Sequence, residues 1–314
     1  MSFNQIAVLG AGTIGASWAA LFAASGRDVC VYDPDAGAPD RVRALVETVA
    51  PTLRELGWAE AGKSDRLTFT DDPVKAVQGA EFIQESVPER LEIKHALYAQ
   101  IEPHLAEDAI IGSSTSGLTL SDMQRGFAEP GRLILAHPFN PPHLIPLVEI
   151  MGNERTLDGV LDRAQAFYES LGKVCVRLHR EIPGHIANRL QAAIWRETVH
   201  LVMEGVASLE DVDKAVTYGP GLRWAAMGPN TLFHLGGGAG GIRGFCDHLG
   251  APFQSWWNDL GKPDLDPATV DALERGVSEA TDGISQEDLA AKRDALVLQY
   301  VKAAMAARNG GSHA

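Results

Sequence analysis

The sequence predicts an α/β fold, a doubly wound Rossmann-type domain followed by an all-α helical domain. Three observations predict it. Strand-like and helix-like segments alternate in the first half, a glycine-rich turn joins the first strand to the first helix, and residues 185–314 keep a helical period with few β-branched runs. A chain of 314 residues is long enough for two domains of roughly 150 residues each. We expect their boundary near Pro183, which gives domains of residues 1–184 and 185–314.

The order of elements follows from the apolar runs and the turns between them. A strand at 6–9, a helix over 14–25 and a strand at Asp28–Tyr32 form a βαβ unit, which requires a parallel, right-handed crossover. An amphipathic pattern predicts a helix over 38–65. Further strands are expected at 67–70, 81–84, 110–112, 133–136 and 144–150, and further helices at 74–78, 92–104 and 155–171.

Composition excludes several classes of partner. The 41 acidic and 27 basic residues give a net charge of −14, which disfavours nucleic acid. Three distant cysteines, with no CxxC or Cys/His cluster, argue against a disulfide framework and a metal site, and they favour a reducing compartment. No basic leader precedes the first strand, and no apolar run approaches the about 18 residues of a membrane span. We therefore expect a cytoplasmic protein that needs no membrane, metal or nucleic acid.

A GxGxxG motif at residues 10–15 follows the first strand directly. Gly10 permits a tight turn, Gly12 leaves room for a pyrophosphate, and Gly15 lets the helix pack closely on the strand. The positive end of the helix faces the phosphates. The expected cofactor-binding residues in this turn are Gly10, Gly12, Thr13, Ile14 and Gly15.

The second strand is followed by Asp33, 18 residues after the last glycine of the motif (33 − 15 = 18). A carboxylate there accepts hydrogen bonds from the ribose hydroxyls and repels a 2′-phosphate, which favours NAD over NADP. A glycine-rich turn in another α/β protein is the alternative. FAD shares the fingerprint, but no second FAD-type segment is visible.

Three polar side chains follow neighbouring strands. Ser116 lies in the SSTSGL run after one strand, His137 follows the next, and Glu149 lies near the end of a third. The carboxyl ends of strands converge on the ligand crevice of an open sheet. Histidine suits the removal of a hydroxyl proton near neutral pH, and Glu149 on its other nitrogen would fix the tautomer. Ser116 would hydrogen-bond the substrate oxygen.

Each of these residues has a structural alternative. The serine run could serve only to cap a helix that begins near Thr119. His137 could be a strand-end residue bonded to backbone, and Glu149 could pair with an arginine.

Nearly the whole chain resembles the 3-hydroxyacyl-CoA dehydrogenase superfamily. The motifs that carry the resemblance are GAGTIG at 10–15, ESVPERL at 85–91 with Lys94, SSTSGL at 113–118, HPFNPP at 137–142, PLVEI at 146–150 and PGHIANRL at 183–190. The resemblance implies that the active site is formed by Ser116, His137, Glu149 and Asn188. It also implies that Asn140 supports the same loop, and that Glu89 and Lys94 contact the nicotinamide half of NAD.

Departures from the family pattern point to a free hydroxy acid. The lysine-rich hairpin that binds coenzyme A looks shorter, Ser114 replaces the usual asparagine, and the segment GPGLRW at 219–224 contains an arginine. In this it resembles the subgroup of lambda-crystallin, an L-gulonate 3-dehydrogenase, and L-carnitine 3-dehydrogenase. Arg223 would bind the substrate carboxylate in a bidentate manner, with Arg243 as a second candidate. The alternative for Arg223 is a surface arginine paired with an acid.

The substrate tail is harder to assign. Aromatic faces hold a trimethylammonium group, and Trp224 with other helical-domain aromatics (Phe233, Phe245, Trp256 and Trp257) is available for one, although large aromatics more often serve as core. A sugar-acid chain would instead need polar partners. The segment 236–243 resembles carnitine-type sequences more closely.

The sequence therefore predicts NAD-dependent oxidation of a small free L-3-hydroxy acid to the 3-oxo acid, of the carnitine 3-dehydrogenase type. The alternatives are an L-gulonate 3-dehydrogenase, an L-3-hydroxyacyl-CoA dehydrogenase, and a crystallin-like NAD-binding structural protein. Because the family dimerises and residues 190–206 form an apolar helical stretch, we also expect a homodimer. The same stretch is compatible with a buried core helix.

Overall fold

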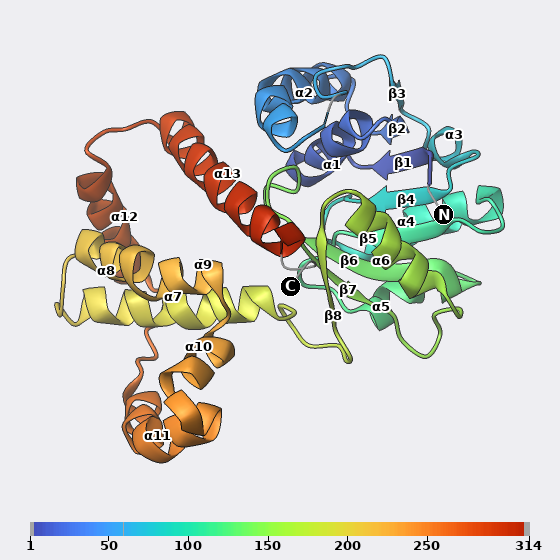
Figure 1. The fold of residues 1–314 in the computed structure, drawn as a ribbon. Coiled ribbons are helices and arrows are strands. Elements are labelled where there is room, and N and C mark those ends of the chain that lie inside the picture. The colour runs from blue at the N-terminus through green and yellow to red at the C-terminus, as the bar shows by residue number, and fades with distance from the viewer. Residues whose placement is uncertain (1–2, 59, 311–314) are drawn as a thin grey trace. The chain divides into compact units, whose positions relative to one another are not determined.

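The computed structural model describes residues 3–58 and 60–310. The described residues contain one eight-stranded sheet in the order β3-β2-β1-β4-β5-β6-β7-β8 (Figure 1). Its strands are β1 (Gln5–Leu9), β2 (Asp28–Tyr32), β3 (Leu67–Thr70), β4 (Phe82–Glu85), β5 (Ile110–Ser113), β6 (Leu133–Pro138), β7 (Leu147–Met151) and β8 (Val174–Arg177). Neighbouring strands are parallel except β6 and β7, which are antiparallel. The direction of winding reverses between β1 and β4, the place where an open α/β sheet binds its ligand.

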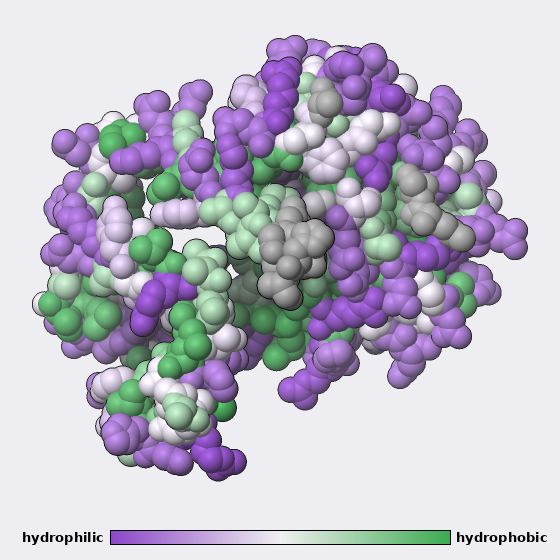
Figure 2. All heavy atoms as spheres, viewed as in Figure 1, coloured by the Kyte–Doolittle hydropathy of each residue, from purple (hydrophilic) through white to green (hydrophobic). Residues whose placement is uncertain are grey.

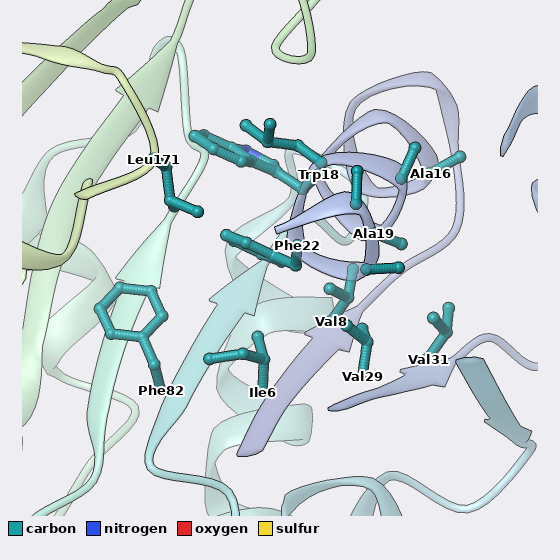
Figure 3. Packing of buried hydrophobic residues seen from close by; sticks show 14 of the residues in the cluster. Ile6, Val8, Ala16, Trp18, Ala19, Phe22, Val29, Val31, Phe82 and Leu171 are labelled. Atoms are coloured by element: carbon teal, nitrogen blue, oxygen red, sulfur yellow. The ribbon is translucent and has the colours of Figure 1, made fainter. Parts of the chain in front are cut away.

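Helices cover both faces of this sheet. One face packs against α1 (Thr13–Ala24), α2 (Ala38–Glu55) and α6 (Val160–Ser170), and the other against α3 (Pro73–Val77), α4 (Leu91–Ile101) and α5 (Leu120–Gln124). Successive side chains of β1 point to opposite faces of the sheet. Ile6 and Val8 therefore join the hydrophobic core on one face, and Ala7 and Leu9 join the core on the other. In the first core, Trp18 stacks on Phe22 with ring centroids 5.3 Å apart (Figure 3).

Three local expectations need correction. The helix expected over 38–65 ends at Glu55, because Gly57 takes a left-handed conformation with φ +95°. The helix expected from 155 begins at Val160, after Gly159 with φ +79°. The strand expected from 144 begins at Leu147. The N–H groups of Leu144 and Ile145 donate to the Pro141 carbonyl, so these two residues belong to a turn before the strand.

Strand β8 was not predicted from the sequence. Its four residues, VCVR, pair with β7 at the edge of the sheet and are exposed or half-buried. A run this short lacks the length and burial that make a strand recognisable from its pattern.

The chain divides into two compact units between Ala187 and Asn188. In the described residues of the second unit, every regular element is a helix or a helical turn. Its elements are α7 (Ala187–Met203), α8 (Leu209–Val216), a π turn η3 (Thr217–Gly221), α9 (Leu222–Ala226), α10 (Pro229–Gly236), a 3-10 turn η4 (Gly238–Gly240), α11 (Gly241–Asp259), α12 (Pro267–Thr281) and α13 (Gln286–Gly310). The predicted α/β fold followed by a helical domain is therefore confirmed.

Apolar side chains reach the surface of the helical unit (Figure 2). Within its described part, the buried hydrophobic residues are Val199, Val212, Leu298 and Val301. None of the described helices combines the length and the apolar character that a membrane crossing requires.

Candidate active site

The glycine turn between β1 and α1 leaves open space in front of the helix. Gly10 has φ +93°, and a Cβ there would lie 2.6 Å from the Ser86 carbonyl oxygen. A Cβ at Gly15 would collide with the Gly10 carbonyl, whereas a Cβ at Gly12 would meet nothing within 4 Å. Gly12 and Thr13 are exposed at the N-terminus of α1, and no side chain caps that end. The turn therefore fits a pyrophosphate held on backbone N–H groups.

Asp33 lies at the carboxyl end of β2 and faces a pocket of about 270 Å³. One carboxylate oxygen accepts a hydrogen bond from the Ala11 N–H at 2.7 Å, and the other accepts one from the Asp35 N–H at 2.9 Å. Asp35 and Asp71 line the same pocket. Three carboxylates around this space repel a 2′-phosphate, so the adenosine side of the crevice fits NAD. Asp33 also fixes the glycine turn, a second role that the motif alone does not predict.

His137 and Glu149 form a buried pair across β6 and β7. The antiparallel register places the two residues opposite each other, and His137 Nδ1 lies 2.9 Å from Glu149 Oε2. The carboxylate accepts, so the imidazole carries its proton on Nδ1 and leaves Nε2 free to take another. The chain reverses through a loop that contains a cis bond between Asn140 and Pro141. This arrangement is that of a general base with an orienting carboxylate.

The second oxygen of Glu149 binds the start of α7. Oε1 accepts hydrogen bonds from the N–H groups of Ile186 and Ala187 at 2.8 and 3.0 Å. Burial alone would raise the pKa of Glu149, but the hydrogen bonds from His137, Ala187 and Ile186 outweigh it, and the pKa lies below its usual value. Glu149 is therefore ionised at neutral pH, and its partner is this histidine rather than an arginine.

The serine run forms a loop organised by Glu89. Its Oε1 accepts hydrogen bonds from Thr115 Oγ1 at 2.5 Å and from the N–H groups of Ser116 and Gly117 at 2.8 Å each. Ser116 itself is exposed. The alternative role of the run as a helix cap belongs to Thr119, whose side chain accepts from Asp122 N at the start of α5. The cap therefore comes from Thr119, and Ser116 has no part in it.

Lys94 lies below the surface, with an exposed fraction of 1 %. Its Nζ is 2.7 Å from Glu85 Oε1 and 3.6 Å from Glu89 Oε2. Glu85 is wholly buried and also accepts from Tyr98 and Ser113 at 2.7 and 2.6 Å. Burial and the neighbouring Glu85 raise the pKa of Tyr98 well above its usual value. Through Glu89, this buried network connects β4 and α4 to the serine loop.

Sequence reasoning missed Glu85 and His185. Glu85 ends the central strand β4, beside the point where winding reverses, and an acid at such a strand end is a signal that could have been used. His185 lies in the PGHIANRL motif, is 4 % exposed, and has its ring centroid 5.0 Å from that of His137. No local pattern marks a histidine as a neighbour of another 48 positions away (185 − 137 = 48).

The other candidates are dispersed over loops and the helical unit. Asn140 is exposed in the loop after β6, and Asn188 is half-buried in the first turn of α7. Arg223 in α9 and Arg243 in α11 are exposed, and neither forms an ion pair with any residue that the structure describes. The alternative for Arg223, a surface arginine paired with an acid, is therefore not seen. Trp224 is half-buried beside it.

Most of the candidate aromatics of the helical unit pack on one another. Phe233 and Phe245 stack with centroids 4.6 Å apart, and Phe253 meets both edge-on or tilted. Trp256 packs against Phe253 at 4.9 Å. These rings join α10 to α11, whereas no ring contact of Trp224 is seen among the described residues.

A dinucleotide crevice and a buried His–Glu pair on one sheet define an NAD-dependent oxidoreductase that acts on an alcohol. Residues 5–182 match the family model "3-hydroxyacyl-CoA dehydrogenase, NAD binding domain", and residues 184–280 match "3-hydroxyacyl-CoA dehydrogenase, C-terminal domain". The chain belongs to the 3-hydroxyacyl-CoA dehydrogenase family, as the ordered motifs predict.

L-carnitine dehydrogenases are similar to nearly the whole chain. L-carnitine dehydrogenase from Streptomyces coelicolor is 48 % identical over 300 residues, which are 96 % of this chain and 94 % of that one. L-carnitine dehydrogenase from Pseudomonas aeruginosa is 41 % identical, with the same coverage of both chains.

Solved structures share the fold. The crystal structure of 5-formyl-3-hydroxy-2-methylpyridine 4-carboxylic acid 5-dehydrogenase, an NAD⁺-dependent dismutase, has a TM-score of 0.80 at 29 % identity and covers 95 % of this chain and 97 % of that one. 3-Hydroxybutyryl-CoA dehydrogenase from Escherichia coli K12 has a TM-score of 0.64 at 30 % identity and covers 75 % of this chain and 50 % of that one.

Proposed function

We propose that this enzyme oxidises L-carnitine, or a free L-3-hydroxy acid closely similar to it, to the 3-oxo acid with NAD. The observation that carries the chemistry is the His137–Glu149 pair, in which the carboxylate takes the Nδ1 side of the ring and Nε2 is the nitrogen that would accept the hydroxyl proton. The carnitine dehydrogenases, at up to 48 % identity, support the choice of substrate.

The chain's own residues divide the reaction between them. Glu149 holds the Nδ1 proton of His137 and stabilises the imidazolium that forms when Nε2 takes the hydroxyl proton. Ser116, on the loop fixed by Glu89, hydrogen-bonds the alcohol oxygen as it gains negative charge, and we assign Asn188 the same role. The glycine turn and Asp33 hold the cofactor, with Glu89 and Lys94 on the side of the nicotinamide. When bound, NAD supplies the hydride acceptor.

A free carboxylate at the other end of the substrate requires a cation without an acid partner. Arg223 and Arg243 meet that requirement among the described residues, and a guanidinium binds a carboxylate through two parallel hydrogen bonds. We assign the carboxylate to Arg223 and the trimethylammonium group to an aromatic face, with Trp224 as the first candidate. Asn140 supports the loop between His137 and Glu149.

The region that would bind coenzyme A argues against a thioester substrate. Its five basic side chains already have partners within the protein. Arg41 pairs with Asp35, Arg43 with Asp40, Lys63 with Glu60 and Arg66 with Asp28, and Arg54 donates to the Ala61 carbonyl. Phosphates would compete with these acid partners, so the segment is a weaker phosphate site than one of unpaired basic side chains.

A substrate screen tests the proposal. NAD reduction, followed by absorbance with L-carnitine, L-gulonate, L-3-hydroxybutyrate and 3-hydroxybutyryl-CoA, should give its highest kcat/KM for L-carnitine. Arg223→Ala should raise the KM for L-carnitine by about tenfold to a hundredfold, the value of a lost charged hydrogen-bonded pair. Saturable oxidation of 3-hydroxybutyryl-CoA that survives Arg223→Ala would instead assign the enzyme to the thioester substrates.

We further propose that the enzyme is a cytoplasmic homodimer. The three cysteines are free, which fits a reducing compartment. On α7, Leu190, Ile194 and Trp195 are exposed apolar side chains, as expected of a helix that meets a partner copy.

A further inference from the structure

His185 is a buried imidazole to which the proposed chemistry assigns no role. Its backbone is left-handed, with φ +51°, directly after Gly184 at φ +73°. Among the described residues, Asp282 is the only other non-glycine residue with positive φ. Such a conformation is strained for a non-glycine residue, and it persists where the surroundings enforce it.

The ring of His185 bridges two parts of the candidate site. Its Nε2 lies 3.2 Å from the carbonyl oxygen of Thr115, and because a carbonyl only accepts, Nε2 carries the proton. The ring centroid lies 5.0 Å from that of His137, at an interplanar angle of 53°. The next two residues along the chain donate their N–H groups to Glu149. One short turn therefore contacts the serine loop, the base and the carboxylate of the base.

Burial favours the neutral form of the His185 imidazole. Burial is the largest effect, and it lowers the pKa of His185. A positive charge on His137 would lower this pKa as well. The hydrogen bond to Thr115 and the carboxylates of Glu149 and Glu89 raise the pKa by less. Only one of the two neighbouring rings then becomes cationic when His137 accepts a proton. The neutral ring also keeps the donor on Nε2 that Thr115 requires.

We propose that His185 is a positioning residue, which holds the Thr115–Ser116 backbone against the imidazole of His137. The alcohol oxygen has to reach Ser116 and His137 at once, so the separation of loop and base sets the rate of proton removal. This inference rests on the proposed proton transfer from a secondary alcohol. It adds a requirement that neither the His137–Glu149 pair nor the Glu89 contacts supply.

Two substitutions separate the hydrogen bond from the ring. His185→Phe keeps an aromatic ring of similar size and removes the donor, whereas His185→Gln keeps an N–H donor of similar reach and removes the ring. Both substituted residues must adopt the left-handed backbone of position 185. The two variants therefore share any backbone strain and are compared with each other. With L-carnitine, we expect kcat to fall by about tenfold in His185→Phe and to recover to within about threefold of wild type in His185→Gln. The KM for NAD should not change in either.

His95→Phe is the matched control. His95 Nε2 also meets a backbone carbonyl, that of Asp122 at 2.8 Å, but its contact lies on α5 rather than on the serine loop. This variant should retain wild-type kcat. Equal losses of kcat in His185→Phe and His185→Gln, or wild-type kcat in His185→Phe, would overturn the assignment.

Two measurements test the inference without turnover. In ¹⁵N-edited NMR spectra of the wild-type protein at pH 7, His185 should be the neutral tautomer with its proton on Nε2. Amide hydrogen exchange in residues 114–118 should accelerate in His185→Phe and not in His185→Gln. A protonated His185, or unchanged exchange, would contradict the inference even if no hydroxy acid in the screen is oxidised, an outcome that would count only against the proposed function.

Discussion

At the scale of single residues, Glu149 connects the imidazole of His137 to the backbone at the start of α7. One of its oxygens orients His137, and the other accepts two N–H groups at the start of α7. A carboxylate can accept at both oxygens, whereas an amide has one oxygen and one donor group. The position therefore requires a carboxylate on chemical grounds.

Glu149→Gln should lower kcat by at least about a hundredfold, because the amide must present a donor either to His137 or to the α7 backbone. Steady-state NAD reduction measures the effect, with NAD binding followed separately by tryptophan fluorescence. His137→Ala provides the comparison: it should abolish turnover and also leave NAD binding intact. Near-normal kcat in the Glu149→Gln enzyme would show that His137 needs no ionised partner.

Asp33 places a carboxylate at the pocket beside β2 and also accepts the Ala11 N–H of the glycine turn, so we expect it to act on the cofactor in two ways. Asp33→Ala should raise the KM for NAD and relax the discrimination against NADP by about tenfold or more, since a repulsive carboxylate is removed from the pocket. The ratio of kcat/KM for the two cofactors measures this. Asp71→Ala, in the same pocket, is the control for charge without the contact to the turn. If the ratio of kcat/KM for NAD and NADP stayed unchanged in Asp33→Ala, the ribose 2′-hydroxyl of the cofactor would not lie beside Asp33.

Lys173 is a buried lysine, and burial lowers the pKa of its ammonium group to about 7. Its Nζ donates to the carbonyls of Pro142 and Ile145, the latter at 3.1 Å, and lies 5.1 Å from the centre of the Trp18 ring. These contacts fix the loop between β6 and β7 to α1, which begins at the glycine turn.

The sign of the resulting pH dependence follows from the lowered pKa. Below pH 7 both the folded and the unfolded chain bind the Lys173 proton, and burial of the charge costs its full amount. Between pH 7 and 10.5 the unfolded chain keeps the proton that the folded chain has lost, so the free energy of unfolding rises with pH. Urea unfolding at pH 6.5 and 9.5 should show wild type gaining a few kcal/mol relative to Lys173→Met, roughly as the lowered pKa implies. A constant difference between the two proteins would mean that Lys173 stays charged.

At the scale of elements, β4 and α4 are joined by the buried Glu85–Lys94 pair. Removing one partner leaves an uncompensated buried charge, so Glu85→Gln or Lys94→Met should each lower the free energy of unfolding by about 3 to 5 kcal/mol. The double variant should recover part of that loss because no lone charge remains. Chemical unfolding of all four proteins forms the cycle that measures the coupling. Additive losses would show that the pair is not coupled.

The antiparallel pairing of β6 and β7 is the element-level feature on which the base depends. Every other neighbouring pair of strands is parallel. The reversal places His137 opposite Glu149 on adjacent strands, with Cα partners set by the register. A shift of the register by one residue would turn Glu149 to the other face of the sheet and leave His137 without its carboxylate.

At the scale of the whole molecule, the helical unit buries few of its large apolar side chains. In its described part, Trp195, Trp256 and Trp257 are 51 %, 56 % and 63 % exposed. Exposed apolar surface of this extent is typical of an interface. A second copy of the chain is the occupant that we propose.

Light scattering of the purified protein should therefore give the mass of two chains, about twice 33.6 kDa. Trp195→Glu should shift the protein toward the monomer, because a carboxylate is costly to bury in an apolar interface. Leu157→Glu is the control, an equally exposed apolar side chain in the N-terminal unit at 59 %. A wild-type monomer would leave the apolar surface of α7 without the proposed partner.

Sequence reasoning was strongest where the signal is local. The GxGxxG turn, the βαβ unit around it and the positions of Ser116 and His137 near strand ends could be predicted from short windows. Glu149 was expected near the end of its strand, but it lies in the middle of β7 and faces His137 because β7 runs antiparallel to β6. The end of α2 depends on a single residue, since Gly57 stops the helix that was expected to continue to residue 65. The edge strand β8 was missed because it pairs along one side only and is partly exposed.

Local conformation and spacing were enough to identify the class of enzyme, because the cofactor-binding turn and the polar side chains of neighbouring strands are recognisable in short stretches of the chain. The groups that support these residues became visible in the folded chain: Lys94 pairs with Glu85, Glu89 holds the serine loop, and His185 lies beside His137. These partners lie 9 to 48 positions apart and meet through strand register and a reversal of the chain. Such meetings depend on how the whole sheet packs, which no short stretch of sequence contains.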